Sequence, residues 1–308
     1  MSITPKAAVL PVTMMLACAC SKPEQPPAAE NRYFSTPEQA VSALVSALEA
    51  NEIDRVERLL GMQGLLSSGD EIADGAARER FLSRYRERNE LVAGGPDDLV
   101  LQVGEDPWPL PIPLIRRDGT WSFDGPAGAE ELILRRIGRN ELRAIQVMRG
   151  YVEAQREYAS ASHDGLQAGI YAQRVNSTPG KHDGLYWPDT TGEPRSPLGP
   201  LIAAAAAEGY AGTNPGGTYH GYHYRMLFAQ GSSAPGGARD YLAGGKLVDG
   251  FALLAYPEKY GVSGIMTLMI NHDGVVWQSD LGEQTTQLAE GMRAFDPDDG
   301  WVPVPREG

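Results

Sequence analysis

The chain has 308 residues, 42 % of them hydrophobic, and a formal net charge of −13. This length is enough for two ordinary domains, each with its own core. The negative charge argues against nucleic acid as a partner, because phosphate contacts need a concentration of Lys and Arg that this field would oppose.

The first 20 residues have the pattern of a lipoprotein-type secretory signal. Lys6 precedes an apolar run of about a dozen residues, which is too short for a permanent transmembrane helix, and small residues follow. Cys18 and Cys20 are the only two cysteines of the chain, so the remainder has no thiol for a disulfide, a metal or nucleophilic catalysis.

The ending "LACAC" resembles a bacterial lipobox, in which a cysteine becomes lipidated at the mature N-terminus. Cys20 is the predicted lipidation site, with cleavage before Cys18 and a plain cleaved signal peptide as alternatives. The Pro-rich residues 21–32 would then form a tether. This interpretation predicts a membrane-anchored lipoprotein on the periplasmic face of the bacterial cell envelope, with the membrane as a partner through its lipid anchor.

Residues 33–125 form the first predicted domain. Thr36 and Pro37 begin a helix, and a second short helix passes through Ile53 and Leu60. A third is predicted to pass through Phe81 and Tyr85 and to reach the Gly94-Gly95-Pro96 breaker. Three strands follow, with a hairpin turn at Asp118-Gly119. Helices followed by a small antiparallel sheet are similar to the cone of the nuclear-transport-factor-two-like fold.

Residues 126–308 form the second predicted domain. Apolar residues at helical spacing predict one long helix over 136–160, namely Leu142, Ile145, Met148 and Val152. Several arginines alternate with glutamates along this helix, and we interpret that face as solvated and ion-paired: Arg135, Arg136, Arg139, Arg143 and Arg149.

A long Gly/Pro loop is expected at 162–218, with a short helix at 201–208. Three β-rich stretches between Tyr222 and Gln278 then predict an antiparallel sheet wrapped on the long helix, with Gly274 in a hairpin turn. The predicted fold class is α+β.

Aromatic and polar side chains within and after the long loop are the predicted ligand or partner surface. Tyr and Trp between turn residues suit such contacts, although they could equally close the core over the long helix. The surface comprises His182, Tyr186, Trp187, Tyr219, His220 and Tyr222.

No catalytic residue, metal site or cofactor is predicted. A strand would place His220 and His223 on opposite faces, and "SSGD" at 67–70 lacks the glycine elbow of a nucleophilic serine, so a cap or turn is the preferred interpretation. "DPDDG" at 296–300 lacks the glutamate of a calcium loop.

Six segments together resemble the bacterial family called domain of unknown function 2950. They are "SSGD", "PWPLPIPL", "RRIGRNEL", "STPGKHDGLYWP", "APGGARDY" and "NHDGVVWQSDLG". The resemblance covers most of the chain and implies a secreted bacterial protein with no assigned activity and no catalytic residues to transfer.

The second half is also distantly similar to the heads of type IV pilins and pseudopilins. A helix "NELRAIQVMRGYVEAQREYAS" is followed by strands and a final hairpin around "NHDG". The apolar membrane half of a pilin helix is replaced here by residues 33–125, so assembly into a pilus is not expected.

Two functions remain open at this level. The first is a non-enzymatic binding or adaptor module of the envelope, with an envelope protein as a further partner. The alternative is a hydrolase that acts on an envelope polymer through carboxylates that cannot be assigned from sequence. A cleft with two suitably spaced carboxyl groups would favour the hydrolase.

Overall fold

The computed structural model describes residues 32–192, 194–210 and 217–305. The predicted signal, most of the tether, Cys18 and Cys20 lie outside the described residues. The described part combines helices with antiparallel sheets, which confirms the α+β class. Within it, no helix is long and apolar enough to cross a membrane.

The chain begins with three helices, α1 (Pro37–Glu49), α2 (Ile53–Leu60) and α3 (Glu71–Glu87). The Thr36 hydroxyl accepts a hydrogen bond from the Gln39 amide at 3.3 Å and caps α1, as predicted. Gly61 ends α2 with φ of 73°, a left-handed conformation that glycine adopts at little steric cost.

The predicted extension of the third helix to Gly94 is wrong. α3 ends at Glu87, and strand β1 (Asn89–Ala93) pairs antiparallel with β2 (Asp98–Val103). The Gly94 amide donates to the Asp98 carbonyl at 3.1 Å, so the breaker forms a hairpin turn between two strands. Five residues are too few for hydrophobic periodicity to distinguish a strand from a helix end.

The first sheet contains five strands in the order β1-β2-β4-β5, with β3 also pairing with β2. The remaining members are β3 (Trp108–Pro109), β4 (Leu114–Arg117) and β5 (Thr120–Phe123). Asp118 and Gly119 both have positive φ in the β4–β5 hairpin, which confirms the predicted turn.

Helix α4 (Gly125–Ala159) is 35 residues long and begins before the predicted start at Arg136. A Cβ atom on Gly125 would lie 2.1 Å from the Leu60 carbonyl, and one on Gly128 would lie 2.4 Å from the Pro111 carbonyl. These glycines therefore let the first turn approach the backbone of the preceding elements closely. The two-domain division stays a prediction, since residues 32–308 cluster as one compact unit.

Two hydrophobic clusters form the core, and α4 contributes to both. Ala129 and Leu132 pack against the cluster built from α1, α2 and the first sheet. Ala144, Met148 and Tyr158 belong to the cluster that includes the second sheet. The helix is thus buried at both ends against different neighbours.

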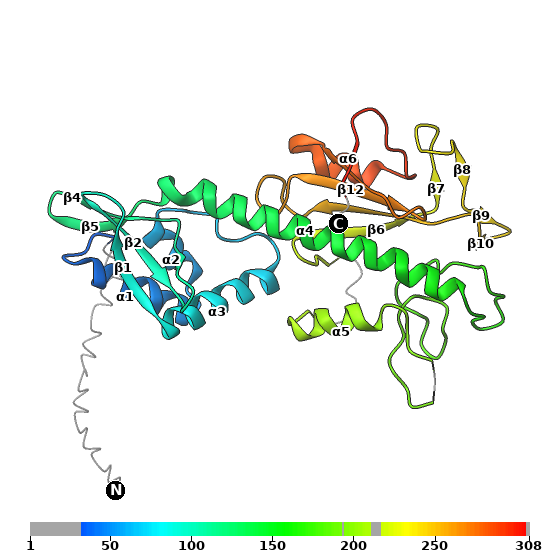
Figure 1. The fold of residues 1–308 in the computed structure, drawn as a ribbon, viewed down its shortest axis with the longest axis horizontal. Helices are drawn as coiled ribbons and strands as arrows, with labels where there is room; N and C mark the ends of the chain where they lie inside the picture. The colour runs from blue at the N-terminus through cyan, green and yellow to red at the C-terminus, as the bar shows by residue number, and fades with distance from the viewer. Residues whose placement is uncertain (1–31, 193, 211–216, 306–308) are drawn as a thin grey trace, which may run out of the picture. The chain divides into compact units, whose positions relative to one another are not determined.

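The second sheet has the strand order β14-β13-β12-β11-β6 and is antiparallel throughout. Figure 1 shows β6 and β12 beside the C-terminal half of α4, and the packing of α4 against β11, β12 and β13 agrees with this view. Its strands are β6 (Tyr222–Leu227), β11 (Ala252–Pro257), β12 (Met266–Asn271), β13 (Val276–Asp280) and β14 (Val302–Pro303).

Short elements connect these parts. They are α5 (Gly199–Ala207), β7 (Ala229–Gln230), β8 (Arg239–Asp240), β9 (Leu242–Ala243), β10 (Lys246–Leu247), the 3-10 helix η1 (Gly282–Gln284) and α6 (Thr285–Gly291). The predicted short helix at 201–208 is confirmed within two residues, and Gly274 has φ of 80° in the β12–β13 turn.

Packing of the long helix on the second sheet is confirmed, although one residue of the predicted apolar stripe is misplaced. Ile145, Met148 and Val152 are buried in the second cluster, whereas Leu142 is 57 % exposed. The predicted relation to pilin heads is not shown.

We expect Ile145→Ala to lower the free energy of unfolding by about 2 to 5 kcal/mol, because it removes buried aliphatic surface and leaves a cavity. Leu142→Ala removes the same number of carbon atoms from an exposed position of the same helix and should cost about 0.5 kcal/mol or less. Denaturant unfolding of both variants would measure this difference. Equal losses would contradict the packing of α4.

Candidate functional site

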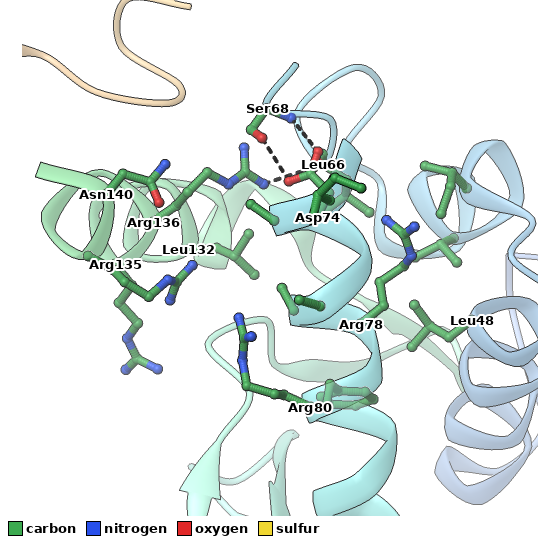
Figure 2. A pocket seen from close by; sticks show the side chains of 18 of the residues that line it. Leu48, Leu66, Ser68, Asp74, Arg78, Arg80, Leu132, Arg135, Arg136 and Asn140 are labelled. Atoms are coloured by element: carbon green, nitrogen blue, oxygen red, sulfur yellow. Dashed lines mark hydrogen bonds between the residues drawn. The ribbon is translucent and has the colours of Figure 1, made fainter. Parts of the chain in front are cut away.

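A cavity of about 390 Å³ lies between α3 and α4. Helices α1 and α2, residues 108–111 and residues 208–210 complete its wall. Figure 2 shows Arg80 from α3 and Leu132 from α4 facing this space. Its volume falls in the range of small-molecule sites, about 300 to 1,000 Å³.

The composition of α3 explains why this space is not filled. Only Leu82 of its seventeen residues is buried, and the cavity side of the helix carries Ala73, Ala76 and Ala77. A helix that packs tightly on its neighbour normally presents a stripe of large apolar residues. The small side chains of α3 instead leave room between it and α4.

The deeper wall of the cavity is apolar. Most of these side chains also belong to the first hydrophobic cluster or pack against it. They are Leu44, Leu48, Ile53, Val56, Leu60, Leu66, Phe81, Trp108, Leu110 and Leu132.

The remaining wall is strongly cationic, although the whole chain is acidic. Only two carboxylates, those of Asp74 and Glu208, line the cavity beside seven arginines. The arginines are Arg78, Arg80, Arg84, Arg135, Arg136, Arg139 and Arg143.

Three of these arginines are held by neighbours. Arg136 is 8 % exposed and donates to the Leu65 and Leu66 carbonyls at 3.1 and 2.9 Å, and burial lowers its pKa. Arg135 pairs with Glu131 at 2.6 Å and lies over the Trp108 ring, as an aromatic face favours. Arg143 pairs with Glu208 at 3.3 Å.

The guanidiniums of the other four form no hydrogen bond or ion pair within the described residues: Arg78, Arg80, Arg84 and Arg139. Loss of solvent lowers the pKa of Arg80, and the charge of Arg143 lowers it further. Loss of solvent also lowers the pKa of Arg139, followed by the charges of Arg80 and Arg143. Guanidiniums from α3 and α4 therefore repel one another, and the charges of Glu208 at Arg80 and Asp74 at Arg139 offset part of this repulsion.

Both carboxylates of the wall already have partners. Asp74 accepts from the Ser68 amide and from the Ser68 hydroxyl, each at 2.8 Å, as the dashed lines in Figure 2 show. Glu208 is engaged by Arg143. Neither carboxylate pairs with the four arginines that lack partners.

A buried carboxylate, Asp70, holds the wall together at the start of α3. It is 2 % exposed and accepts hydrogen bonds from the Ala73 amide at 2.9 Å, the Tyr210 hydroxyl at 2.8 Å and the Gly221 amide at 2.8 Å. The first bond caps α3, which confirms the interpretation of "SSGD" as a cap. The other two tie α3 to chain segments far away in sequence.

His220 lies next to this junction in an uncommon backbone conformation, with φ of 54°. Its Nδ1 lies 3.0 Å from a guanidinium nitrogen of Arg143. Arginine can only donate, so this Nδ1 accepts and the ring is neutral with its proton on Nε2. Burial, and then the charge of Arg143, lower the pKa of His220, which agrees with the neutral form.

The structure separates the predicted aromatic surface into two groups. Tyr219 and His220 pack on Tyr210 beside the cavity, with ring centroids 4.7 and 5.7 Å away. His182 and Trp187 lie together at 4.5 Å near Tyr158, at the C-terminal end of α4. Arg143 and Tyr158, the α4 residues that contact the two groups, are about 22 Å apart along the helix.

Several members of that surface are core residues. Trp187 is 3 % exposed and Tyr222 is fully buried, while Tyr186 packs on the second cluster. His223 approaches Glu258 and not His220. Among residues 32–192, 194–210 and 217–305, no group of three or more His, Cys, Asp or Glu side chains could hold a metal ion.

Sequence reasoning missed the cavity because it treated the arginines of the long helix as a solvated, ion-paired face. Arg135 and Arg143 are ion-paired, as predicted, whereas Arg136 is buried and the Arg139 guanidinium forms no ion pair among the described residues. A usable signal was present in two places. Arg136, Arg139 and Arg143 share one helical face, and α3 combines alanines with Arg80 and Arg84.

The comparisons with known proteins assign a family but no activity. The family described as protein of unknown function (DUF2950) matches residues 31–304, so the chain belongs to this family. No curated protein and no solved structure gives a significant match.

We expect Asp70→Ala to lower the free energy of unfolding by on the order of 3 kcal/mol, because it removes a cap and leaves two buried donors unpaired. Thr36→Ala removes a cap that accepts one exposed hydrogen bond and should cost only about 1 kcal/mol. Urea unfolding would compare the two variants. An Asp70→Ala loss no larger than that of Thr36→Ala would contradict the role of Asp70 as a junction.

Proposed function

We propose that the protein is a non-enzymatic binding module of the bacterial envelope, and that the cavity between α3 and α4 binds a small anionic ligand. The observation that carries this proposal is the group of three arginines without partners, Arg80, Arg84 and Arg139, in the lining of a partly apolar cavity. Guanidiniums that repel one another are stabilised by an anion, which can accept their N–H groups directly.

The state of the cavity carboxylates favours binding over hydrolysis of an envelope polymer. A glycosidase-type reaction needs one carboxyl group as an acid and a second as a base or nucleophile. Asp74 is occupied by Ser68 and Glu208 by Arg143. The groups left over in the cavity are cations, which suit recognition of a negative charge.

The envelope location is part of the same proposal and rests on the sequence of the leader. We propose that Cys20 is lipidated and that residues 21–32 tether the folded part to the membrane on its periplasmic side. An envelope protein as a second partner, in an adaptor role, is compatible with this anchoring.

We expect anilinonaphthalene sulfonate, a fluorescent anion with an aromatic body, to bind at one saturable site. Arg139→Gln should weaken this binding about tenfold, because a hydrogen bond between charged groups contributes roughly 1.5 to 3 kcal/mol. Fluorescence titration of the folded chain from residue 32 measures both affinities.

Arg149→Gln is the matched control. Arg149 lies on the same helix and does not line the cavity, so its replacement should leave the affinity unchanged. No saturable binding, or an equal loss in both variants, would overturn the assignment of the cavity as the ligand site.

We expect Cys20→Ala to move the full-length protein from the membrane fraction into the soluble periplasmic fraction. The physical reason is that a lipidated cysteine anchors through burial of its acyl chains, whereas the folded part has no spanning helix among its described residues. Fractionation followed by mass spectrometry of the N-terminal peptide measures the change. Lipid found on Cys18, or unchanged membrane partition, would contradict the assignment to Cys20.

A further inference from the structure

The cavity combines two surfaces that a simple anion would not use together. Its deeper wall is built from large apolar side chains of α1 and α2 with Phe81 and Trp108, while the arginines lie on α3 and α4. Inorganic phosphate or a short carboxylate would satisfy the guanidiniums and make no use of the apolar part of the lining.

The arginines form two facing rows. Arg80 and Arg84 are one turn apart on α3, and Arg136, Arg139 and Arg143 follow one face of α4. Arg80, Arg84 and Arg139 remain exposed, whereas the apolar residues Leu44, Val56 and Leu60 are buried. The charged side chains of the lining are therefore open to solvent, whereas these apolar side chains are largely covered.

The alanine surface of α3 connects the two regions. Ala73, Ala76 and Ala77 line the cavity on the same helix that carries Arg80. These small side chains span little more than one helical turn and leave an apolar passage beside the arginines. We expect an unbranched hydrocarbon chain to fit this passage.

We propose that the cavity binds a single-tailed anionic amphiphile, with its carboxylate or phosphate head held by Arg80, Arg84 and Arg139 and its alkyl tail buried against the apolar wall. This inference rests on the proposed function and adds the chemical class of the ligand. Two sources share this chemistry, a free fatty acid and a lysophospholipid with a phosphate head.

Isothermal titration calorimetry with dodecanoate, below its critical micelle concentration, tests the class directly on the folded chain. The expected result is binding of one molecule per chain, with no detectable binding of acetate, which lacks the tail. Dodecyltrimethylammonium and dodecyl maltoside carry the same tail on a cationic and a neutral head, and both should bind at least about tenfold more weakly.

Lauroyl lysophosphatidate, titrated in parallel, distinguishes the two sources. Binding of dodecanoate alone assigns a fatty acid, binding of the lysolipid alone assigns a lipid phosphate, and binding of both supports the shared class. A further outcome is that neither ligand binds while anilinonaphthalene sulfonate still binds in an Arg139-dependent manner. That result would contradict the proposed amphiphile and support the proposed anion site.

Two variants test the head and the tail separately. The double variant Arg80→Glu, Arg139→Glu should reverse the preference from dodecanoate to dodecyltrimethylammonium. Ala77→Phe should fill the passage and abolish dodecanoate binding, whereas Ala161→Phe, an exposed position outside the cavity, should not. Unchanged preference in the first variant, or unchanged binding in the second, with circular dichroism showing a folded protein, would overturn the proposal.

Discussion

Burial of one long helix at its two ends is the constraint on which the rest of this structure depends. Helix α4 places Ala129 and Leu132 against the first hydrophobic cluster, and it places the residues from Ala144 to Tyr158 against the second. Neither the helical bundle at the N-terminus nor the antiparallel sheet at the C-terminus could bury its apolar face equally well without it. A helix of this length is stable because both ends gain tertiary packing.

The middle of α4 follows from the same constraint. Between its two ends the helix passes from one cluster to the other, and its sequence from Arg135 to Arg143 is mostly polar, with Ile137 buried among these residues. Arg136 joins it to the loop before α3 through the Leu65 and Leu66 carbonyls, and Asn140 donates to the Ser263 carbonyl at 2.9 Å. The cavity is located where the helix leaves the first cluster and faces the alanines and arginines of α3.

A small number of hydrogen-bonding groups hold one wall of this cavity in place. Asp70, Tyr210 and the loop before β6 share one buried network, and His220 adopts a left-handed conformation beside it. Strained residues of this kind persist only where the surroundings hold them, and they concentrate at functional sites. Their position next to the arginines is therefore consistent with a binding site at the junction of the two clusters.

Local sequence determined the elements whose signals are short in range. The start of α1 at Thr36, the end of α2 at Gly61 and the β4–β5 turn at Asp118-Gly119 could be predicted. Each depends on the local preferences of the residues at that position. The spacing of Ile145, Met148 and Val152 likewise identified the face of α4 that is buried on the second sheet. The resemblance of six segments to one family was also available from sequence alone.

Only the tertiary structure decided what the charged residues do. An arginine on an amphipathic helix has the same local pattern whether it is solvated or faces a second row of arginines, since the partner lies tens of residues away. The same limit explains β1, because its strand character comes from pairing with β2. It also explains Trp187 and Tyr222, which are core residues because segments distant in sequence bury them. Sequence therefore determined the caps and turns that act locally, although it gave neither the end of α3 nor the start of α4. The cavity arose from side chains that the fold brought opposite one another, a property that no local preference encodes.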